Sequence, residues 1–388
     1  MTSPESITAP LHSRDIAGAR NVRDEDAFGV TAMARWLHAH AAPDAGDIDL
    51  SVVPHVKQFS GGASNLTYLL RYPGGDLILR RPPRGRHHGG AHDMAREYRI
   101  QTQLAQFLPY VPRTIALCED PEVIGTPFYV MRRFDGLIPR KNLPTGLVLD
   151  REQTAVLCRN AIDLLVSLHQ VDLASVGLSD LEKRDGYVRR QVEGWSQRYR
   201  KARTWNVGRF EHVMRWLADN QPADRPHTLV HNDFRFDNIV LDTMDPTRPV
   251  GLLDWELATV GDPLMDLANS LGYWVQADDG RQLQAFRRQP THLPGMMTRG
   301  QVVAYYCART KTTVTNRDWA WYQVFGLFRV TVIAQQVHFR YMTKQTTNKQ
   351  FRFFGVAVVL LELRCRRIIA KAKRMPPHIA AAQVGSPS

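Results

Sequence analysis

The N-terminal third of the chain alternates short apolar runs with turn residues. Apolar positions at helical spacing predict an amphipathic helix over 26–40. Short strands are expected at Val52-Val53, 67–70, 77–80 and 128–131. The motif YPGGD between the second and third of these strands predicts a tight hairpin turn, and a second helix is expected over 91–107. This part of the chain is therefore predicted to be a β-rich lobe.

The rest of the chain is dominated by helical periodicity. From Glu152 to His169 the apolar residues fall on one helix face. Further helices are expected within 185–220, 263–276, 298–314, 317–345 and 351–373. The sequence therefore predicts an α+β protein with a β-rich N-terminal lobe and a mainly helical C-terminal lobe.

The two lobes are expected to meet at a hinge in the motif RFDG, Arg133 to Gly136. The predicted organisation is a flexible N-terminal lead (1–25), an N-terminal lobe with its preceding helix (26–135), a helical C-terminal lobe (136–376) and a disordered tail (377–388).

One loop is unusually dense in carboxylates and carboxamides. Between the apolar runs Thr228–Val230 and Ile239–Leu241 lies HNDFRFDN, which contains Asp233 and Asn238, and Asp254 follows the next apolar run in GLLDWE. Since Mg²⁺ prefers hard oxygen ligands, we expect Asn238 and Asp254 to bind it. Asp233 is then expected to accept the proton of an attacking hydroxyl group. Phosphoryl transfer requires this combination of groups.

Other residues of this loop are expected to have supporting roles. Asx residues in loops often only cap turns, but the joint occurrence of HxD-x4-N and LLDWE favours the catalytic interpretation. His231 is expected to pack and to hydrogen-bond the loop, and Asn232 tolerates a positive φ better than most residues. Arg235 is expected either to offset the carboxylates or to reach the transferred phosphate.

Composition adds a preference for an anionic partner. The 388 residues carry a net charge of +12, with a pI of about 9.7, which favours a nucleotide, a phosphorylated substrate, nucleic acid or a membrane surface. Four scattered cysteines without a CxxC pair argue against a zinc site or a disulfide framework. We see no signal peptide and no run that could span a bilayer, and we therefore expect a cytoplasmic protein without a membrane partner.

The segments HNDFRFDNIVLD and VGLLDWELATVGDPLMDLANSLGYW resemble the aminoglycoside phosphotransferase/choline kinase-like family. More narrowly, they resemble the branch of kinase domains fused to, or encoded beside, acyl-CoA dehydrogenases. The similarity covers most of residues 50–350 and implies a bilobal protein-kinase-like fold. It also implies that Asp233 is the catalytic base, that Asn238 and Asp254 are magnesium ligands, and that Asp266 braces the catalytic loop.

The resemblance implies that the N-terminal lobe binds a nucleotide, ATP or GTP. In FSGGASNL, Gly61 and Gly62 permit close approach of a phosphate to the backbone. Polar groups of Ser60, Ser64 and Asn65 can donate hydrogen bonds to phosphate oxygens. This short motif differs from the GxGxxG of protein kinases, and its position before a hairpin strengthens the assignment.

Protein kinases place a lysine at the end of the strand that here reads LILRR. In this sequence that position carries Arg80, with Glu97 as its expected partner and Arg81 as the alternative if the register differs by one residue. By resemblance, the backbone of Met131 and its neighbours would meet the adenine. Arginine still binds phosphate, so the departure affects nucleotide geometry more than the class of reaction.

The acceptor is harder to specify from sequence. The stretch 183–209 contains nine Lys and Arg residues with interleaved aromatic residues. It is either a solvated basic helix face or a binding surface for the phosphates and adenine of coenzyme A. The resemblance implies a small-molecule acceptor, a hydroxyacyl-CoA of the 4-hydroxyacyl-CoA type. The candidate substrate contacts are Arg189, Arg190, Trp195, Arg235 and Trp274.

Two alternatives remain open at this stage. The first is an aminoglycoside or amino-alcohol O-phosphotransferase, for which a net charge of +12 is a poor match because aminoglycosides are polycations. The second is a pseudokinase that only holds CoA or a nucleotide, which the intact Asp233, Asn238 and Asp254 disfavour and Arg80 keeps open. The lack of a recognised module disfavours nucleic acid as a partner, and a homodimer is left open.

Overall fold

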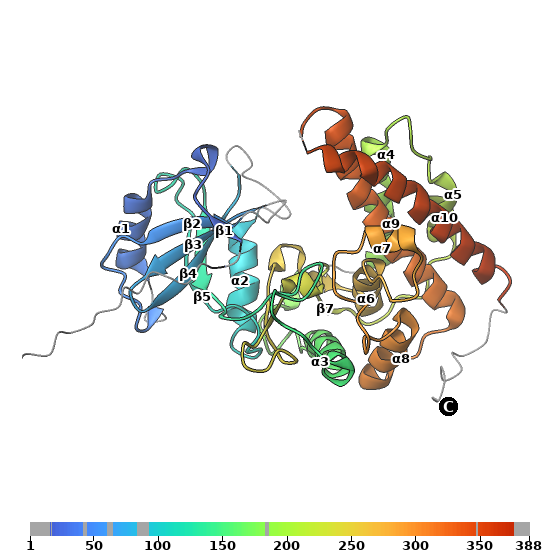
Figure 1. The fold of residues 1–388 in the computed structure, drawn as a ribbon, viewed down its shortest axis with the longest axis horizontal. Coiled ribbons are helices and arrows are strands. Elements are labelled where there is room, and N and C mark those ends of the chain that lie inside the picture. Colours follow the sequence, from blue (N-terminus) through green and yellow to red (C-terminus); the bar gives the residue numbers. More distant parts are fainter. Residues whose placement is uncertain are drawn as a thin grey trace, which may run out of the picture. The chain divides into compact units, whose positions relative to one another are not determined.

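The computed structural model describes residues 16, 18–41, 45–59, 65–83, 93–182, 186–346 and 348–375 (Figure 1). The chain divides into two compact units, Met1–Phe134 and Asp135–Ser388. This boundary lies one residue before the division expected from the sequence. A sheet dominates the first unit and helices dominate the second, which confirms the predicted α+β fold class.

A six-stranded antiparallel sheet forms the frame of the first unit. In spatial order its strands are β1 (Ala19–Arg20), β2 (His55–Phe59), β3 (Leu66–Tyr72), β4 (Gly75–Arg81), β6 (Phe128–Arg132) and β5 (Thr114–Cys118). The predicted hairpin joins β3 to β4, where Tyr72 pairs with Gly75. Gly74 in this turn has φ +85°, and a Cβ there would lie 2.3 Å from the Asp47 carbonyl oxygen. The turn therefore requires glycine.

Side chains on these strands alternate between two hydrophobic cores. On β4, Leu77 and Leu79 belong to the core that includes α1 (Val30–His40), whereas Ile78 belongs to the core that includes α2 (Met94–Leu104). Successive side chains of a pleated strand point to opposite faces. Figure 1 shows the sheet between these two helices. The alternation decides which side of the sheet each polar residue of β4 reaches.

Two expected elements of the first unit differ from the structure, and three of its strands were not expected. Val52 and Val53 lie in an exposed turn instead of a strand, because Pro54 follows them and offers no N–H to a sheet. The helix expected over 26–40 begins only at Val30. The strands β1, β2 and β5 were not expected from the sequence.

Helices form most of the second unit. They are α3 (Arg151–His169), α4 (Tyr187–Ala202), α5 (Glu211–Asp219), α6 (Pro263–Gly272), α7 (Arg281–Ala285), α8 (Arg299–Thr310), α9 (Asn316–Met342) and α10 (Phe354–Ala372). Two short sheets pair β7 (Thr228–Val230) with β10 (Thr259–Gly261), and β8 (Ile239–Leu241) with β9 (Pro249–Leu252). Short 3₁₀ helices are η1 (Asp24–Asp26), η4 (Ser179–Leu181), η5 (Phe236–Asn238), η6 (Trp255–Leu257) and η7 (Lys349–Phe353). Within the described part of the chain, no helix is long and apolar enough to cross a membrane.

Helix α6 starts as the sequence predicts. Asp262 is its N-cap, its carboxylate accepts a hydrogen bond from the Leu264 N–H at 2.8 Å, and Pro263 occupies the first helical position. The Tyr322 hydroxyl on α9 donates to the other oxygen of Asp262 at 2.6 Å. Asp262 thus anchors α6, which leaves Asp266, one turn further along, available for another contact.

Helices α6 and α9 cross at two glycines. A Cβ on Gly326 would lie 2.1 Å from the Ala268 carbonyl oxygen, and a Cβ on Gly272 would lie 2.9 Å from the Gly326 carbonyl oxygen. Because neither position has room for a side chain, the two backbones approach each other directly. The crossing therefore fixes where along α9 the end of α6 lies.

Candidate active site

The polar loop connects β7 to β8 and is tied to the end of β9. Ile239 on β8 pairs with Leu252 on β9, and the Leu253 N–H donates to the Asn238 carbonyl oxygen at 2.8 Å. In this antiparallel register, Asn238 precedes one strand and Asp254 follows its partner. The hairpin therefore places Asn238 and Asp254 at the same end of the two strands.

The ring of His231 contacts both the loop, at Asp233, and the end of β9, at Leu253, and these contacts determine its protonation state. Its Nε2 lies 3.0 Å from the Leu253 carbonyl oxygen, which can only accept, and its Nδ1 accepts from the Asp233 N–H at 3.2 Å. These contacts define a neutral imidazole that carries its proton on Nε2. Complete burial lowers the pKa of His231, although nearby carboxylates oppose the shift. This geometry is that of a residue that packs and hydrogen-bonds the loop.

Asp266 accepts hydrogen bonds from the backbone at the start of the loop. Its Oδ2 accepts from the His231 N–H at 2.7 Å, and its Oδ1 accepts from the Asn232 N–H at 2.9 Å. His169 Nε2, at the end of α3, lies 3.2 Å from Oδ2, and the Tyr306 hydroxyl lies 2.7 Å from His169 Nδ1. Burial opposes ionisation of Asp266, but the hydrogen bonds from His169 and the loop hold its pKa below the usual value.

Asn232 adopts the left-handed conformation, with φ 65°. Its side-chain Nδ2 donates to the Leu257 carbonyl oxygen at 3.1 Å, and its backbone N–H reaches Asp266. Asn232 therefore adopts the positive φ that the sequence analysis expected asparagine to tolerate. The turn directs Asp233, the next residue, away from the anchored backbone.

The carboxylate of Asp233 is held from two directions. Asn238 Nδ2 donates to Asp233 Oδ2 at 3.0 Å and to its carbonyl oxygen at 2.9 Å. On the other side, Arg235 Nε lies 3.2 Å from Oδ1, and a terminal nitrogen of Arg235 donates to Oδ2 at 3.3 Å. The Asp233 side chain keeps 19% of its surface exposed, so a hydroxyl group from outside can reach it.

Asn238 and Asp254 present oxygen atoms that suit a magnesium ion. Because the Asn238 nitrogen is committed to Asp233, its amide oxygen is the atom turned away from that residue. Asp254 has φ 68°, which is uncommon for a residue other than glycine and occurs where the surrounding structure enforces it. The described residues contain no group of three or more His, Cys, Asp or Glu side chains suited to a metal. Two protein ligands completed by substrate oxygens are typical of Mg²⁺, so this donor pair fits the ion.

Arg235 is shared by two carboxylates at the tip of the loop. A terminal nitrogen lies 3.3 Å from Asp237 Oδ2, and the guanidinium lies 4.8 Å from the centroid of the Tyr273 ring. Burial works against its charge, but Asp233 and Asp237 raise the pKa of Arg235 well above the usual value. Burial raises the pKa of Asp237. Arg235 therefore stays charged and offsets the carboxylates, which is one of the two roles expected from the sequence.

The hydrogen bonds at this tip are incomplete. Among the described residues, Asp237 Oδ1 is buried without a hydrogen-bond partner. Arg235 Nε makes a close ion pair with Asp233, but its N–H is not directed at an acceptor in that part of the chain. The tip therefore holds donors and acceptors that are not fully used by the protein itself.

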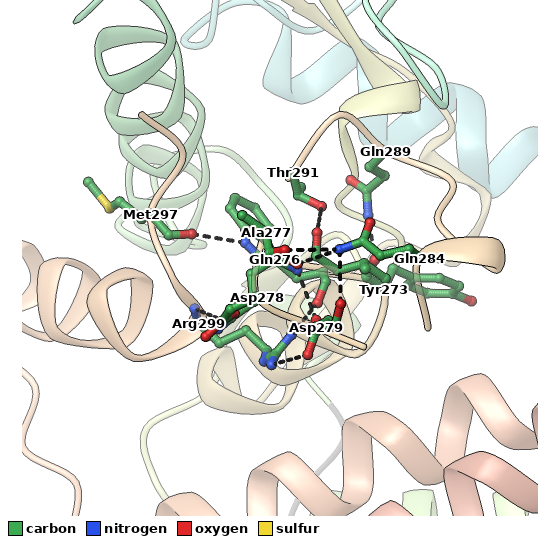
Figure 2. Close-up of polar contacts among 12 residues, drawn as sticks. Tyr273, Gln276, Ala277, Asp278, Asp279, Gln284, Gln289, Thr291, Met297 and Arg299 are labelled. Atoms are coloured by element: carbon green, nitrogen blue, oxygen red, sulfur yellow. Dashed lines mark hydrogen bonds and ion pairs between the residues drawn. The ribbon is translucent and has the colours of Figure 1, made fainter. Parts of the chain in front are cut away.

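The segment after α6 supports the loop from the far side. Gln289 Oε1 accepts from the Phe236 N–H at 2.8 Å, and Gln289 Nε2 donates to the Tyr273 carbonyl oxygen at 3.5 Å. Figure 2 shows Arg299 reaching both oxygens of Asp279, at 2.6 and 2.8 Å. Arg299, the first residue of α8, also donates to the Trp274 carbonyl oxygen at 2.8 Å, which ties the start of α8 to the residue after Tyr273.

In the first unit, Arg80 forms the predicted pair with Glu97. Arg80 Nε lies 3.3 Å from Glu97 Oε1 on α2, and the Tyr129 hydroxyl donates to the same oxygen at 2.9 Å. Burial, with Glu97 beside it, raises the pKa of Tyr129 well above its usual value. Arg81 instead donates to the Tyr68 hydroxyl at 2.8 Å, on the other face of the sheet. The strand alternation therefore selects Arg80 over Arg81.

The remaining predicted nucleotide contacts are only partly visible. Ser60, Gly61, Gly62 and Ser64 lie outside the described residues. Asn65 is buried just before β3, and Met131 is buried on β6, where it pairs with Ile78 of β4. Their roles in nucleotide binding stay predictions.

The predicted substrate contacts fall into two groups. Arg189 and Arg190 are exposed on α4, and Trp195 is half-buried on the same helix. Trp274 is buried instead: its indole N–H donates to the Met297 carbonyl oxygen at 3.0 Å, and its ring lies against Phe236. Trp274 therefore has a packing contact in place of the exposed surface expected for a substrate contact.

Sequence reasoning missed three residues of this region: His169, Tyr273 and Arg329. His169 ends a helix that otherwise reads as an ordinary amphipathic element. Arg329 is the only lysine, arginine or acidic residue between Asp318 and Arg340 in an otherwise mostly apolar stretch of α9. A lone charge in a buried helix is rare without a partner, and this signal could have identified Arg329.

Comparison with solved structures supports the fold. A putative aminoglycoside phosphotransferase from Ralstonia eutropha is 27% identical, with a TM-score of 0.73 over 89% of this chain and 99% of that chain. A choline kinase from Cryptosporidium parvum is 12% identical, with a TM-score of 0.57 over 89% and 97% of the two chains. The predicted kinase-like fold is therefore confirmed.

Comparison at the sequence level gives the same family and longer relatives. The sequence profile of the phosphotransferase enzyme family (APH) matches residues 55–299. Acyl-CoA dehydrogenase family member 10 from Mus musculus is 35% identical over 87% of this chain and 31% of its own length. Acyl-CoA dehydrogenase family member 11 from Rattus norvegicus is 31% identical over 83% of this chain and 41% of its own length. The chain thus spans less than half the length of both relatives.

Proposed function

Because this chain belongs to the phosphotransferase enzyme family, we propose that it is a kinase that uses ATP and Mg²⁺ to phosphorylate the hydroxyl group of a hydroxyacyl-CoA. A phosphotransferase that acts on a hydroxyl group is what the family and the similar structures support. The nucleotide, the metal and the acceptor are the proposed parts. The product would feed the breakdown of fatty or hydroxy acids.

The observation that carries the proposal is the position of the Asp233 carboxylate. It lies beside the Asn238 amide nitrogen, at 3.0 Å, while the hairpin places Asn238 and Asp254 at the same end of its two strands. One side chain, Asn238, thus holds the proposed base through nitrogen and keeps its oxygen for a cation. This arrangement supports proton acceptance by Asp233 next to a cation held by Asn238.

Each residue of the loop has a defined task in this proposal. Asp233 orients the acceptor hydroxyl and takes its proton as the oxygen attacks the terminal phosphate. Asn238 and Asp254 would hold a magnesium ion through their side-chain oxygens, and the ion would supply positive charge to neutralise the phosphate groups. Arg235 holds Asp233 in position and keeps its charge, because Asp237 and Asp233 both face it.

Nucleotide binding is proposed for the first unit. A similar aminoglycoside phosphotransferase, 15% identical, was solved with AMP-PNP and hygromycin B. In this chain, Arg80 is held by Glu97 at 3.3 Å, so its guanidinium is pre-oriented at a position from which protein kinases contact phosphates. Arginine forms paired hydrogen bonds to phosphate and fits this task.

The acceptor is proposed from the relatives and from charge. The curated relatives at 35% and 31% identity carry the name acyl-CoA dehydrogenase. A coenzyme A ester is polyanionic, and this chain has a net charge of +12 with exposed arginines on α4. An aminoglycoside acceptor is the second candidate, favoured by the name of the structure at 27% identity, but a polycation suits this charge poorly.

The proposal is tested with a panel of acceptors. The purified chain is mixed with ATP, Mg²⁺ and either a 4-hydroxyacyl-CoA, an aminoglycoside or choline, and the release of ADP is followed. We expect ADP release only with the hydroxyacyl-CoA, and mass spectrometry should detect a phosphorylated acyl-CoA. Chelation of the metal should stop the reaction.

The controls separate the alternatives. ADP release with the aminoglycoside and none with the hydroxyacyl-CoA would establish the second candidate. Nucleotide binding without transfer to any acceptor would show a pseudokinase. Omission of the acceptor measures the background hydrolysis of ATP.

A further inference from the structure

Two arginines share the indole ring of Trp195. The guanidinium carbon of Arg198, on the same helix, lies 4.6 Å from the ring centroid, and that of Arg329, on α9, lies 5.0 Å from it. A ring face compensates a positive charge only in part. Two like charges on one ring therefore form a strongly cationic cluster in the second unit.

Arg329 is unusual because it is buried and has no counter-charge among the residues that the structure describes. Its residue surface is 5% exposed, and its Nε has no hydrogen-bond partner among the described residues. In that same part of the chain, no carboxylate forms an ion pair with Arg329 or Arg198. Buried guanidinium groups normally have an acid or a carbonyl oxygen beside them. The group that would neutralise this cluster is therefore not among the protein side chains described here.

The crossing of α6 and α9 brings this cluster towards the catalytic loop. Arg329 follows Gly326 by three residues and so lies on the same side of α9, while Tyr273 directly follows Gly272 at the end of α6. Burial raises the pKa of Tyr273 to about 12, Asp233 adds to the rise, and the charges of Arg235 and Arg329 oppose it. Both arginines are therefore within electrostatic range of one tyrosine ring.

We propose that Arg329 and Arg198, arranged around Trp195, form a subsite that binds an anionic group of the acceptor molecule, a phosphate or a carboxylate. This inference rests on the proposed kinase function of the Asp233 loop and names the residues that select its acceptor. The bound anion would accept hydrogen bonds from Arg329 and remove the repulsion between the two guanidinium groups. Trp195 holds both side chains in the orientation that presents their N–H groups.

An acyl-CoA acceptor can supply such an anion from two sources. The carrier itself has phosphate groups, and a dicarboxylic acyl chain has a free carboxylate at its end. Thioesters that differ in the carrier or in the acyl chain therefore distinguish the two sources. The N-acetylcysteamine thioester of the same hydroxyacyl group has no phosphate and serves as the matched acceptor.

The test compares kcat and KM of Arg329→Gln and Arg198→Gln for these two thioesters. For Arg329→Gln we expect KM for the hydroxyacyl-CoA to rise roughly 10- to 100-fold, since a hydrogen bond from a buried charged donor is lost. The exposed Arg198 should give a smaller rise. KM for ATP and for the phosphate-free thioester should stay unchanged. Arg329→Lys, which keeps the charge without the planar fork, should restore part of the affinity.

Matched controls separate charge from fold. Arg215→Gln removes an exposed arginine of α5 outside the cluster and should leave every constant unchanged. Circular dichroism and thermal unfolding report whether Arg329→Gln folds. If it does not fold, Arg329→Lys and Arg198→Gln provide the test. Arg329→Lys keeps a long, charged side chain, and Arg198→Gln changes an exposed residue.

The outcomes distinguish the subsite from the proposed function. A loss of affinity confined to dicarboxylic acyl chains, on either carrier, supports the subsite and identifies the carboxylate as its ligand. Equal constants for all variants, or a rise in KM for ATP alone, overturns the subsite. If the wild-type chain transfers no phosphate to either thioester, the proposed function fails. Calorimetric binding of coenzyme A and of a dicarboxylic acyl thioester to wild type and Arg329→Gln then tests the subsite independently: weaker binding of either ligand by the variant supports it, and equal or no binding of both overturns it.

Discussion

The loop between β7 and β8 has a base, His231 and Asn232, whose backbone is anchored, and a tip, Asp233 to Asp237, whose hydrogen-bonding groups are not all used. Carboxylates and basic side chains form both parts. At the base, the Asp266 carboxylate accepts hydrogen bonds from two backbone N–H groups and lies beside the His169 ring. At the tip, Arg235 lies between Asp233 and Asp237, where one carboxylate oxygen and one guanidinium N–H have no directed partner in the described chain.

The difference between base and tip suggests that the base contributes to the stability of the loop and the tip to the reaction. A carboxylate whose oxygens are committed to the backbone can hold a loop but is not available to a substrate. A carboxylate that is partly exposed and held by side chains can give up one of these hydrogen bonds and accept a proton from a substrate. Changes at the base should therefore act mainly on folding, and changes at the tip mainly on turnover.

The strongest test of the tip is Asp233→Asn. The amide cannot take the proton of the acceptor hydroxyl, so we expect kcat to fall by about 10³-fold or more while the fold and nucleotide binding persist. Steady-state kinetics and nucleotide titration provide the measurement. Asp219→Asn, an exposed change on α5, serves as control and should retain full activity. Normal turnover by Asp233→Asn would remove this residue from the mechanism.

The corresponding test of the base is Asp266→Asn. This change replaces a buried carboxylate by an amide that cannot accept all three contacts, so the free energy of unfolding should fall by about 3–5 kcal/mol. Urea denaturation measures the loss. Asp163→Asn breaks a surface ion pair with Arg309 and should cost less than about 1 kcal/mol. Equal losses in the two variants would contradict the distinction between base and tip.

The dependence of stability on pH provides a smaller test of the base. The folded pKa of His231 lies below its usual 6.5, so below that pH the unfolded chain binds a proton that the folded chain excludes. The contribution of His231 is therefore complete above pH 6.5 and is lost as the pH falls towards the folded pKa, by at most about 1.4 kcal/mol per pH unit.

Denaturation with urea between about pH 7.5 and about pH 5.5 measures this slope. His231→Gln can still donate to the Leu253 carbonyl oxygen and does not titrate, so its slope should be shallower than that of wild type. His292, whose pKa burial also lowers, should account for part of the slope that remains. Identical slopes would show that His231 does not titrate differently in the two states.

The smallest expected effect lies outside the loop, at Arg80. Arg80→Lys keeps the charge beside Glu97 but removes the planar arrangement of donors. We expect KM for ATP to rise roughly two- to tenfold, the equivalent of about one net hydrogen bond, with kcat nearly unchanged. A kinetic titration with ATP tests this. A rise as large as the loss in Asp233→Asn would place Arg80 in the chemical step.

The sequence could relate those candidate residues whose geometry is local. Asn238 and Asp254 flank the two strands of one short hairpin, so a motif of fixed spacing predicts that they lie at the same end of it. The choice between Arg80 and Arg81 needed the alternation of β4, which the sequence leaves uncertain by one residue. His169 reaches Asp266 across 97 positions, and no pattern in either segment specifies that pairing.

The same limit applies to the cationic cluster. Trp195 and Arg198 stood in a stretch that the sequence marked as basic and aromatic, but their partner Arg329 lies on a different helix. Helical periodicity predicts a helix over 317–345 and does not predict which helices pack against it. The packing of α4 and α6 against α9 supplies that information.

The glycine crossing of α6 and α9 has a consequence for the range of acceptors. A contact made by two backbones cannot be adjusted by exchanging side chains, since a Cβ on Gly326 would collide with the Ala268 carbonyl oxygen. The separation between Asp233 and Arg329, which Tyr273 connects, is therefore held constant by the crossing of the two helices. In the proposed complex, the packing of the helices would set the length of acceptor that fits. The side chains on these helices would select its charged groups.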